Sequence, residues 1–186
     1  MPNVTLVVCA APLSSRTVDI ATYLMRDAWS VSIVGTPSSA AWLDIPLLVS
    51  TLGSPPRIDY RTPDQNRSAA DPDAVVVCPA TFNTVNKVAA GIADNYAVSL
   101  ICESVGAGLP VLMAPMVNDK LWRHTALPGA IEALSKSGVR FMDLQSGEHS
   151  LQPIQSGSGA GVVESFQPRW LAAALREMLS GAAIDT

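Results

Sequence analysis

The stretch Val75-Val-Val-Cys-Pro-Ala-Thr-Phe-Asn-Thr84 decides the fold, and a second stretch, Val111-Leu-Met-Ala-Pro-Met-Val-Asn-Asp-Lys-Leu-Trp122, follows the same plan. Each begins as a short apolar run of β-strand type, ends that run at a proline, and continues into a polar cluster that contains an asparagine. Ligands of an open parallel sheet bind beyond the carboxyl ends of its strands. The pattern therefore predicts that the amides of Asn83 and Asn118, which can donate and accept hydrogen bonds, lie in one crevice. The alternative is that each asparagine caps the helix that follows it.

Strand-like and helix-like segments alternate along the rest of the chain. Apolar runs predict strands at 4–9, 30–34, 74–78, 111–114 and 139–142. Helical periodicity predicts helices at 17–28, 83–91, 93–105, 119–137 (interrupted near Pro128) and 168–179, with a short helix from residue 40. This alternation is typical of an α/β fold, a doubly wound parallel sheet of Rossmann-like form in a single domain over residues 1–179. Residues 180–186 are expected to form a frayed tail.

Two segments lack such periodicity. Residues 50–72 are rich in proline and polar groups and predict a long irregular connection, of the kind that is usually functional or mobile. Residues 147–164 are rich in glycine and serine and predict a flexible segment. We interpret the second segment either as a lid over a site or as a disordered loop.

Composition excludes several classes of protein. Hydrophobic residues make up 48% of the chain and charged residues 15%, which is typical of a compact globular protein. The net charge of −4, the pI near 5.0 and the lack of a Lys/Arg cluster argue against nucleic acid as the main partner. A mean hydropathy of +0.27 is high for a soluble monomer, so we expect an oligomer that buries apolar surface between its subunits.

The three cysteines, Cys9, Cys78 and Cys102, indicate a compartment more than a chemistry. An odd count without CxxC spacing predicts reduced thiols, buried as small hydrophobic residues, in a cytoplasmic protein without a metal site. The apolar run at 4–9 has no basic residues before it and is too short for a signal peptide or a membrane span. We therefore expect a cytoplasmic location and no membrane partner.

Hydroxyl groups follow the first two predicted strands. Ala10-Ala-Pro-Leu-Ser-Ser15 joins a strand to a helix, where backbone N–H groups and the helix dipole favour an anion, and Ser14 and Ser15 add hydroxyl donors. Thr36-Pro-Ser-Ser39 supplies a second hydroxyl cluster at the same edge of the sheet. Neither GxGxxG nor GxxxxGK(S/T) is present, so those two phosphate cradles are excluded. The two clusters predict a site for one phosphate and its polyol tail, and the alternative is ordinary capping by Ser and Thr.

The two asparagine-bearing stretches also resemble a known family. Pro79-Ala-Thr-Phe-Asn-Thr84 is similar to the Pro-Ala-Ser-x-Asn-Thr motif of the homo-oligomeric flavin-containing cysteine decarboxylases. That family includes phosphopantothenoylcysteine decarboxylase and the peptidyl-cysteine decarboxylases of lantibiotic pathways. Pro115-Met-Val-Asn-Asp-Lys-Leu-Trp122 resembles its Pro-x-Met-Asn-x-x-Met-Trp motif, with Val117 where Met is usual, and Thr36–Ser39 resembles its second flavin-contacting loop. The similarity spans roughly residues 4–145.

The resemblance implies FMN bound between the subunits of a homotrimer, often assembled into a dodecamer. In the family reaction the flavin oxidises the thiol of a cysteine-containing peptide or small molecule to a thioaldehyde, which loses CO2 to give an enethiol. By position, the phosphate and ribityl chain would be held by Ser14 or Ser15, Thr36 and Ser39. The isoalloxazine and the substrate would lie against Pro79, Ala80, Thr81 and Asn83. The substrate would be bound by Met116, Asn118 and Trp122, with Asn118 on its carboxylate.

The chain also departs from the family pattern. The family's active-site histidine lies fourteen residues before the first proline of the Pro-Ala-Ser motif, a position that Gln65 occupies in this chain. Neither His124 nor His149, the chain's two histidines, fits that position. An imidazole exchanges protons near neutral pH and an amide does not, and losing a general acid–base group typically costs about 10²–10⁴ in rate. Residues 156–161 also lack the cysteine that phosphopantothenoylcysteine decarboxylases carry there, which favours a peptide-modifying member.

Three hypotheses follow from these patterns. The first is an FMN-dependent oxidative decarboxylase of cysteine-containing substrates, with C-terminal peptidyl cysteine favoured. The second is an FMN-binding protein without decarboxylase activity, which is regulatory or catalyses another flavin oxidation. The third, another kind of nucleotide-binding α/β protein, is disfavoured because the asparagine-bearing strand ends match the flavin family better. Asn83, Asn118 and the lid-like segment favour the first hypothesis, while Gln65 favours the second.

Overall fold

The computed structural model describes residues 1–62 and 71–182 of the chain. Parallel strands form a five-stranded sheet in the order β2-β1-β3-β4-β5. Their bounds are β1 (Asn3–Val8), β2 (Ser30–Gly35), β3 (Ala74–Ala80), β4 (Val111–Pro115) and β5 (Arg140–Phe141). The predicted doubly wound parallel α/β fold is confirmed, and each predicted strand is present with its bounds shifted by a few residues at most.

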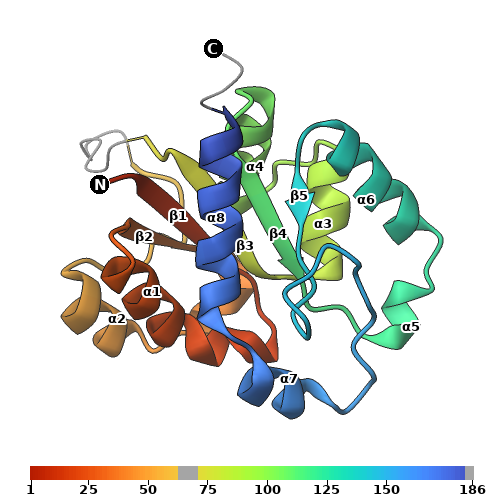
Figure 1. The fold of residues 1–186 in the computed structure, drawn as a ribbon, viewed down its shortest axis with the longest axis horizontal. Coiled ribbons are helices and arrows are strands. Elements are labelled where there is room, and N and C mark those ends of the chain that lie inside the picture. The colour runs from red at the N-terminus through yellow and green to blue at the C-terminus, as the bar shows by residue number, and fades with distance from the viewer. Residues whose placement is uncertain (63–70, 183–186) are drawn as a thin grey trace.

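Helices cover both faces of this sheet (Figure 1). One face packs against α1 (Thr17–Arg26) and α8 (Pro168–Ala182), and the other against α3 (Phe82–Ala89), α4 (Tyr96–Gly106) and α6 (Ala126–Lys136). Shorter elements lie around the loops: η1 (Pro12–Arg16), η2 (Pro37–Trp42), α2 (Ile45–Leu52), α5 (Asp119–Trp122) and α7 (Gly159–Ser165). Within the described residues, no helix is both long enough and apolar enough to cross a bilayer.

The central strand β3 shows why its sequence is an uninterrupted apolar run. Successive side chains of a strand point to opposite faces, so Val76 packs with α1 and α8 while Val75 and Val77 pack with α3, α4 and α6. All seven residues of β3 are buried. A strand covered on both faces needs apolar residues at every position, which accounts for the absence of alternation.

The segment at 50–72 is more regular at its start than predicted. Helix α2 continues to Leu52 and ends at Gly53, which has the left-handed φ of 75° that favours glycine at a helix end. Arg57 then pairs with the outer edge of β2, because its N–H donates to Ile33 O and its carbonyl accepts from Gly35 N. Tertiary hydrogen bonds of this kind leave no trace in local periodicity.

The remaining differences concern the second half of the chain. The helical stretch at 119–137 breaks at 123–125, and Pro128 lies in the first turn of α6, where a missing N–H is tolerated. Residues 147–164 are not uniformly flexible, since they contain the start of α7 and a bridge between Ile154 and Asn118. Helix α8 continues to Ala182, three residues past its predicted end, so the expected frayed tail does not begin at residue 180.

Candidate functional site

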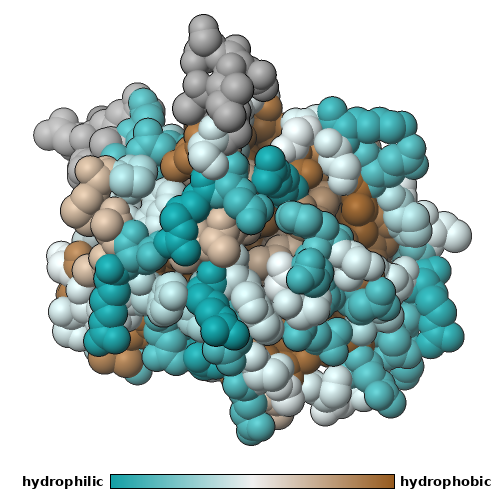
Figure 2. Space-filling view, viewed as in Figure 1, coloured by the Kyte–Doolittle hydropathy of each residue, from teal (hydrophilic) through white to brown (hydrophobic). Residues whose placement is uncertain are grey.

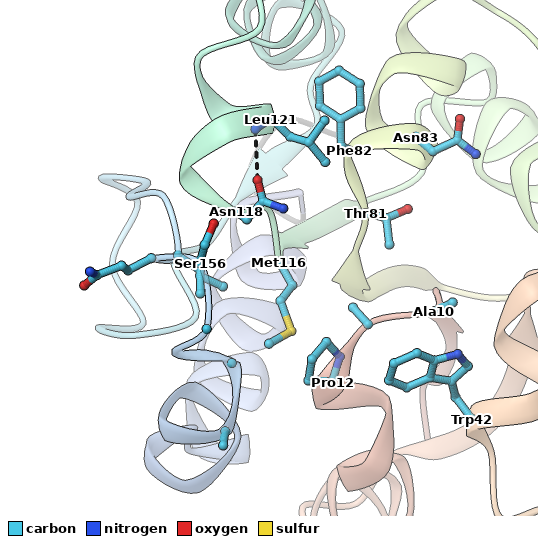
Figure 3. Close-up of a pocket in the computed structure, with 16 residues that line it drawn as sticks. Ala10, Pro12, Trp42, Thr81, Phe82, Asn83, Met116, Asn118, Leu121 and Ser156 are labelled. Atoms are coloured by element: carbon cyan, nitrogen blue, oxygen red, sulfur yellow. Dashed lines mark hydrogen bonds between the residues drawn. The ribbon is translucent and has the colours of Figure 1, made fainter.

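A cavity of about 670 Å³ opens beyond the carboxyl ends of β1, β3 and β4 (Figure 3). In a sheet of this order, ligands bind at the switch point between β1 and β3, which is where the cavity lies. Its walls come from the loop after β1 (Ala10, Ala11, Pro12), the loop after β3 (Thr81, Phe82, Asn83), the loop after β4 (Met116, Asn118, Leu121), η2 (Trp42) and the segment 154–160 (Ile154, Gln155, Ser156, Gly157, Gly159, Ala160).

Asn118 is both a helix cap and a wall of the cavity. Its Oδ1 accepts hydrogen bonds from the backbone N–H groups of Lys120 (3.1 Å) and Leu121 (2.9 Å), which caps α5. The capping alternative therefore holds for the amide oxygen. The amide nitrogen points into the cavity (Figure 3) and has no partner among the described residues. The side chain thus presents a fixed N–H donor to any ligand bound there.

Asn83 lies on the same cavity but does not cap a helix. The cap of α3 is Thr81, whose Oγ1 accepts from the N–H of Thr84 at 3.4 Å. Asn83 falls inside the first turn of α3 and is exposed, with its amide turned away from Asn118 (Figure 3). The two asparagines therefore share the cavity without converging on one point.

The hydroxyl groups of the two loops at this sheet edge donate to the backbone. Ser14 donates to Ala11 O (2.7 Å), Ser15 to Pro12 O (2.9 Å) and Ser39 to Thr36 O (2.7 Å). None of these serines, nor Thr36, is among the residues that line the cavity. A serine hydroxyl carries one proton, so each would have to rotate before donating to a phosphate. Their role in phosphate binding stays a prediction.

Residues at the ends of β3 and β4 hold the three loops together. The carbonyl of Pro79 accepts from Cys9 N (3.2 Å), and that of Ala80 accepts from Met116 N (2.8 Å). Met116 lines the cavity, whereas Trp122 is half-buried and packs with the core on the α3 side instead of forming a wall. Pro79 and Ala80 therefore lie beneath the cavity walls that Thr81 and Met116 provide.

The glycine- and serine-rich segment 154–160 is docked onto the start of α5. Asp119 Oδ1 accepts two hydrogen bonds from Ser156, one from its N–H (3.0 Å) and one from its hydroxyl (2.6 Å). The backbone adds two more, from Asp119 N to Ile154 O (2.9 Å) and from Ile154 N to Val117 O (3.0 Å). The bonds from Ser156, and to a lesser extent Arg123, hold the pKa of the Asp119 carboxyl below its usual value.

The sequence does not single out Trp42 or Asp119 as site residues. Asp119 follows Asn118 directly in the second motif, and this adjacency is a signal that could have identified it. Trp42 follows the second hydroxyl cluster by three residues, yet nothing in its local sequence predicts that it reaches the cavity. Gln65, the expected position of an acid–base group, lies outside the described residues.

The two histidines do not form part of the cavity wall. His124 Nδ1 accepts from Ala126 N (3.1 Å), and its ring makes a T-shaped contact with the ring of Phe82, a wall residue, with 5.4 Å between the ring centroids. His149 Nδ1 is 2.9 Å from Phe141 O. Among the described walls of the cavity there is no charged side chain, so an anion bound there would be held by neutral donors.

These features fit a flavin. Cavities of about 300–1,000 Å³ with apolar walls and a few polar groups are typical cofactor sites. Pro12, Trp42 and Met116 offer apolar surface for a ring system, while Thr81 and Asn118 offer hydrogen-bonding groups to its polar edge or to a substrate beside it.

A model of the protein family described as Flavoprotein matches residues 1–167. The chain belongs to the flavoprotein family. This assignment confirms the family resemblance carried by the motifs at 79–84 and 115–122, and with it the expectation of a flavin cofactor.

Two curated relatives match parts of this flavoprotein. The coenzyme A biosynthesis bifunctional protein CoaBC of Thermococcus kodakarensis is 38% identical over 71 residues, which are 38% of this chain and 17% of the relative. A cysteine/cysteine sulfinic acid decarboxylase of an unknown prokaryotic organism is 34% identical over 110 residues, which are 55% of this chain and 30% of the relative. The flavoprotein chain spans less than a third of the length of either relative.

Solved structures with the same fold include two kinds of decarboxylase. The FMN-dependent cysteine decarboxylase SpaF matches with a TM-score of 0.67 at 20% identity, over 89% of this chain and 97% of its own. A mutant PPC decarboxylase complexed with pantothenoylaminoethenethiol matches with a TM-score of 0.69 at 18% identity, over 96% of this chain and 98% of its own. The two TM-scores are close, so the fold of this flavoprotein does not favour one kind of substrate over the other.

Proposed function

We propose that this flavoprotein binds FMN in the cavity and oxidatively decarboxylates a substrate that ends in cysteine, preferring a C-terminal peptidyl cysteine to phosphopantothenoylcysteine. The observation that carries the proposal is the amide of Asn118, whose oxygen is fixed by the cap of α5 and whose nitrogen points into the cavity. A fixed N–H donor suits a substrate carboxylate, because hydrogen bonds to ionised acceptors are about twice as strong as neutral ones.

The neutral walls support the preference for a peptide. A phosphorylated substrate would bring a second anionic group, and the described walls offer no Lys or Arg to pair with it. A peptide terminus brings one carboxylate, which a single amide donor can hold. The FMN phosphate itself would lie at the hydroxyls of Ser14 or Ser15, Thr36 and Ser39, once the serine hydroxyls turn from their carbonyl partners.

The chemistry that bound FMN supplies is oxidation of the cysteine thiol to a thioaldehyde. The electron-poor thioaldehyde carbon then accepts the electrons of the bond to the carboxylate, which leaves as CO2. In this scheme Asn118 orients the carboxylate, while Trp42 and the segment 154–160 shield the reacting atoms from water. Gln65 would take the place of the family's histidine, and because its amide cannot exchange a proton we expect turnover to be slower by about 10²–10⁴.

We also propose that the flavoprotein works as a homotrimer or a dodecamer. Four large hydrophobic side chains in one short stretch are 36% to 49% exposed: Trp42, Ile45, Leu47 and Val49. The face over α8, in contrast, is mostly hydrophilic (Figure 2). Trp42 belongs to both the exposed stretch and the cavity, so a second copy covering this stretch would close the cavity mouth. Light scattering that finds a monomer still holding flavin would overturn this arrangement.

Three measurements on the purified protein test the proposed function. The protein should be yellow and release FMN on denaturation, and a colourless protein that takes up no added FMN would remove the flavin assignment. Peptides ending in cysteine should lose about 46 Da, for CO2 and two hydrogens, by mass spectrometry. Gln65→His should raise the rate if position 65 faces the flavin.

The second candidate is an FMN-binding protein without decarboxylase activity, regulatory or catalysing another flavin oxidation. Gln65 favours it, since the family's acid–base group is missing from the sequence. Flavin bound in full, with no CO2 released by either the native protein or Gln65→His, would decide for this candidate.

A further inference from the structure

The segment 154–160 forms one wall of the cavity and is fixed at both of its ends. At one end, Ser156 donates two hydrogen bonds to Asp119 at the start of α5. At the other end, Gly159 packs on Pro12 in the loop after β1, where an added Cβ would lie only 3.2 Å from the proline Cγ. The segment therefore spans the cavity from the loop after β4 to the loop after β1 (Figure 3).

The two anchors differ in character. The Gly159 end is held by packing and by η1, because Arg16 Nη1 donates to Val163 O (2.6 Å) just beyond it. The Asp119 end is held by one carboxylate oxygen that accepts both bonds from Ser156, while the other oxygen pairs with Arg123 Nη2 at 2.9 Å. The lowered pKa of Asp119 keeps this carboxylate ionised at neutral pH, so both bonds from Ser156 are charge-assisted.

The Asp119 anchor also fixes the wall relative to Asn118. The two residues are adjacent, and Ile154 bridges both neighbours of the amide through Asp119 N–H and the carbonyl of Val117. The same turn, residues 117–119, therefore both holds the wall in place and sets the direction of the Asn118 amide nitrogen. A wall that left Asp119 would open the cavity beside Asn118.

We propose that Asp119 and Ser156 are positioning residues that hold the 154–160 wall against Asn118 before the substrate arrives, and so set how tightly the carboxyl end of the substrate is held. This role rests on the proposed function, since it assumes that the substrate carboxylate lies at Asn118. If only a fraction of molecules has the wall docked, the apparent dissociation constant rises in inverse proportion to that fraction.

The test compares Asp119→Ala, Asp119→Asn and Ser156→Ala with a matched control, Arg123→Ala. Arg123→Ala removes the ion pair with Asp119 but leaves both hydrogen bonds from Ser156 to Asp119. Ser156→Ala removes the hydroxyl bond and keeps the backbone N–H bond. Asp119→Asn replaces the carboxylate by a neutral amide oxygen that can still accept. The probes are a peptide ending in cysteine, titrated against the FMN-loaded protein, added FMN, and amide hydrogen exchange of residues 154–160.

For Asp119→Ala we expect faster exchange in 154–160 and peptide binding weaker by about tenfold, as when docking falls to a tenth of molecules. In both exchange rate and peptide affinity, Asp119→Asn and Ser156→Ala should lie between Asp119→Ala and the native protein. Arg123→Ala should have the exchange rate and peptide affinity of the native protein. FMN affinity should fall much less than peptide affinity in all four, because the flavin phosphate is expected at the serine and threonine hydroxyls, whereas a general loss of stability would weaken both.

Three results would overturn the role. Native exchange rates in Asp119→Ala would show that the wall does not depend on this anchor. Faster exchange with unchanged peptide affinity would show that wall docking does not position the substrate. A native protein that binds FMN but no cysteine-ended peptide would remove the proposed function together with this role, and that result differs from the other two because it appears without any substitution.

Discussion

Substitutions of Asn118 should separate the stability of the protein from its affinity for substrate, because the two ends of the amide have different partners. Asn118→Asp keeps an oxygen that can accept from Lys120 N and Leu121 N, and Asp caps helices as well as Asn does. Asn118→Ala removes the cap, which costs about 1 kcal/mol in the free energy of unfolding. For a domain of this size, that loss lowers the melting temperature by about 2–4 °C.

Both variants lose the amide nitrogen that faces the cavity. A hydrogen bond to a charged group contributes about 1.5–3 kcal/mol, so each variant should bind a cysteine-ended peptide roughly 10- to 150-fold more weakly. The aspartate variant should be the weaker binder, since it places a carboxylate where the substrate carboxylate would lie. FMN should remain bound in both, because the flavin phosphate is expected at the serine and threonine hydroxyls and not at Asn118.

The assay pairs thermal unfolding with equilibrium titration of the peptide, both on FMN-loaded protein. Native peptide affinity in Asn118→Asp would refute the assignment of the amide nitrogen to the carboxylate. Equal melting temperatures for Asn118→Ala and Asn118→Asp would refute the view that the amide oxygen stabilises α5.

Two further predictions concern the fold itself. Gly147 has a φ of 77° and an added Cβ would lie 2.5 Å from the ring of Trp170, whereas Gly53 has a similar φ of 75° and open space around it. Gly53→Ala should therefore lose about 1–2 kcal/mol from the left-handed backbone alone, and Gly147→Ala should lose about 1–3 kcal/mol more from overpacking; equal losses on denaturant unfolding would contradict the clash. Burial raises the pKa of the Cys9 and Cys78 thiols above the ordinary value of 9.0. As the pH rises, the thiols of the unfolded chain lose their protons before those of the folded protein do. The free energy of unfolding should therefore be lower at pH 10 than at pH 8, because the contribution of the buried thiols is full below about pH 9 and is lost above it.

The fold was predictable because its central strands carry strong local signals. Residues 75–78 and 111–114 are continuous apolar runs that each end at a proline, and burial on both faces of a parallel sheet demands that composition. The pairing of the strands then follows from chain alternation and short crossovers. Strand bounds moved by a residue or two, as hydrogen bonding at strand ends depends on neighbouring loops.

The parts that sequence patterns did not predict depend on contacts between distant residues. The segment around Ile154 is glycine- and serine-rich, yet it is ordered by hydrogen bonds to Asp119 and Val117, about 35 residues earlier in the chain. Just before it, the buried carboxylate of Asp143 accepts from the N–H groups of Gln145, Ser146 and Gln152, which fixes a second irregular turn. A glycine- and serine-rich composition predicts flexibility because such residues have little preference for a helix or a strand. Composition carries no information on hydrogen bonds to residues far away in the sequence.

The candidate site was predictable in position and less so in detail. Parallel strands end at one edge, so the loops holding Asn83 and Asn118 had to meet there, and both side chains do line the cavity. The hydroxyls of Ser14 and Ser39 were expected to face a ligand, but each donates to a carbonyl three residues earlier in its own turn. A serine hydroxyl that lies near an unpaired backbone carbonyl donates to that carbonyl when no ligand is bound. The spacing of residues in the sequence does not distinguish this local hydrogen bond from a bond to a ligand.

The residue type at position 118 shows how capping and binding can be distinguished. Asp, Asn and Ser all cap helices well, so the cap of α5 alone would accept any of the three. Asp would direct a second acceptor at the cavity, and Ser would have a single oxygen for both tasks. Asn alone accepts from the helix through one atom and donates to the cavity through another. The cap therefore explains a polar residue at position 118, and the substrate carboxylate that we propose to bind there would explain why that residue is an asparagine.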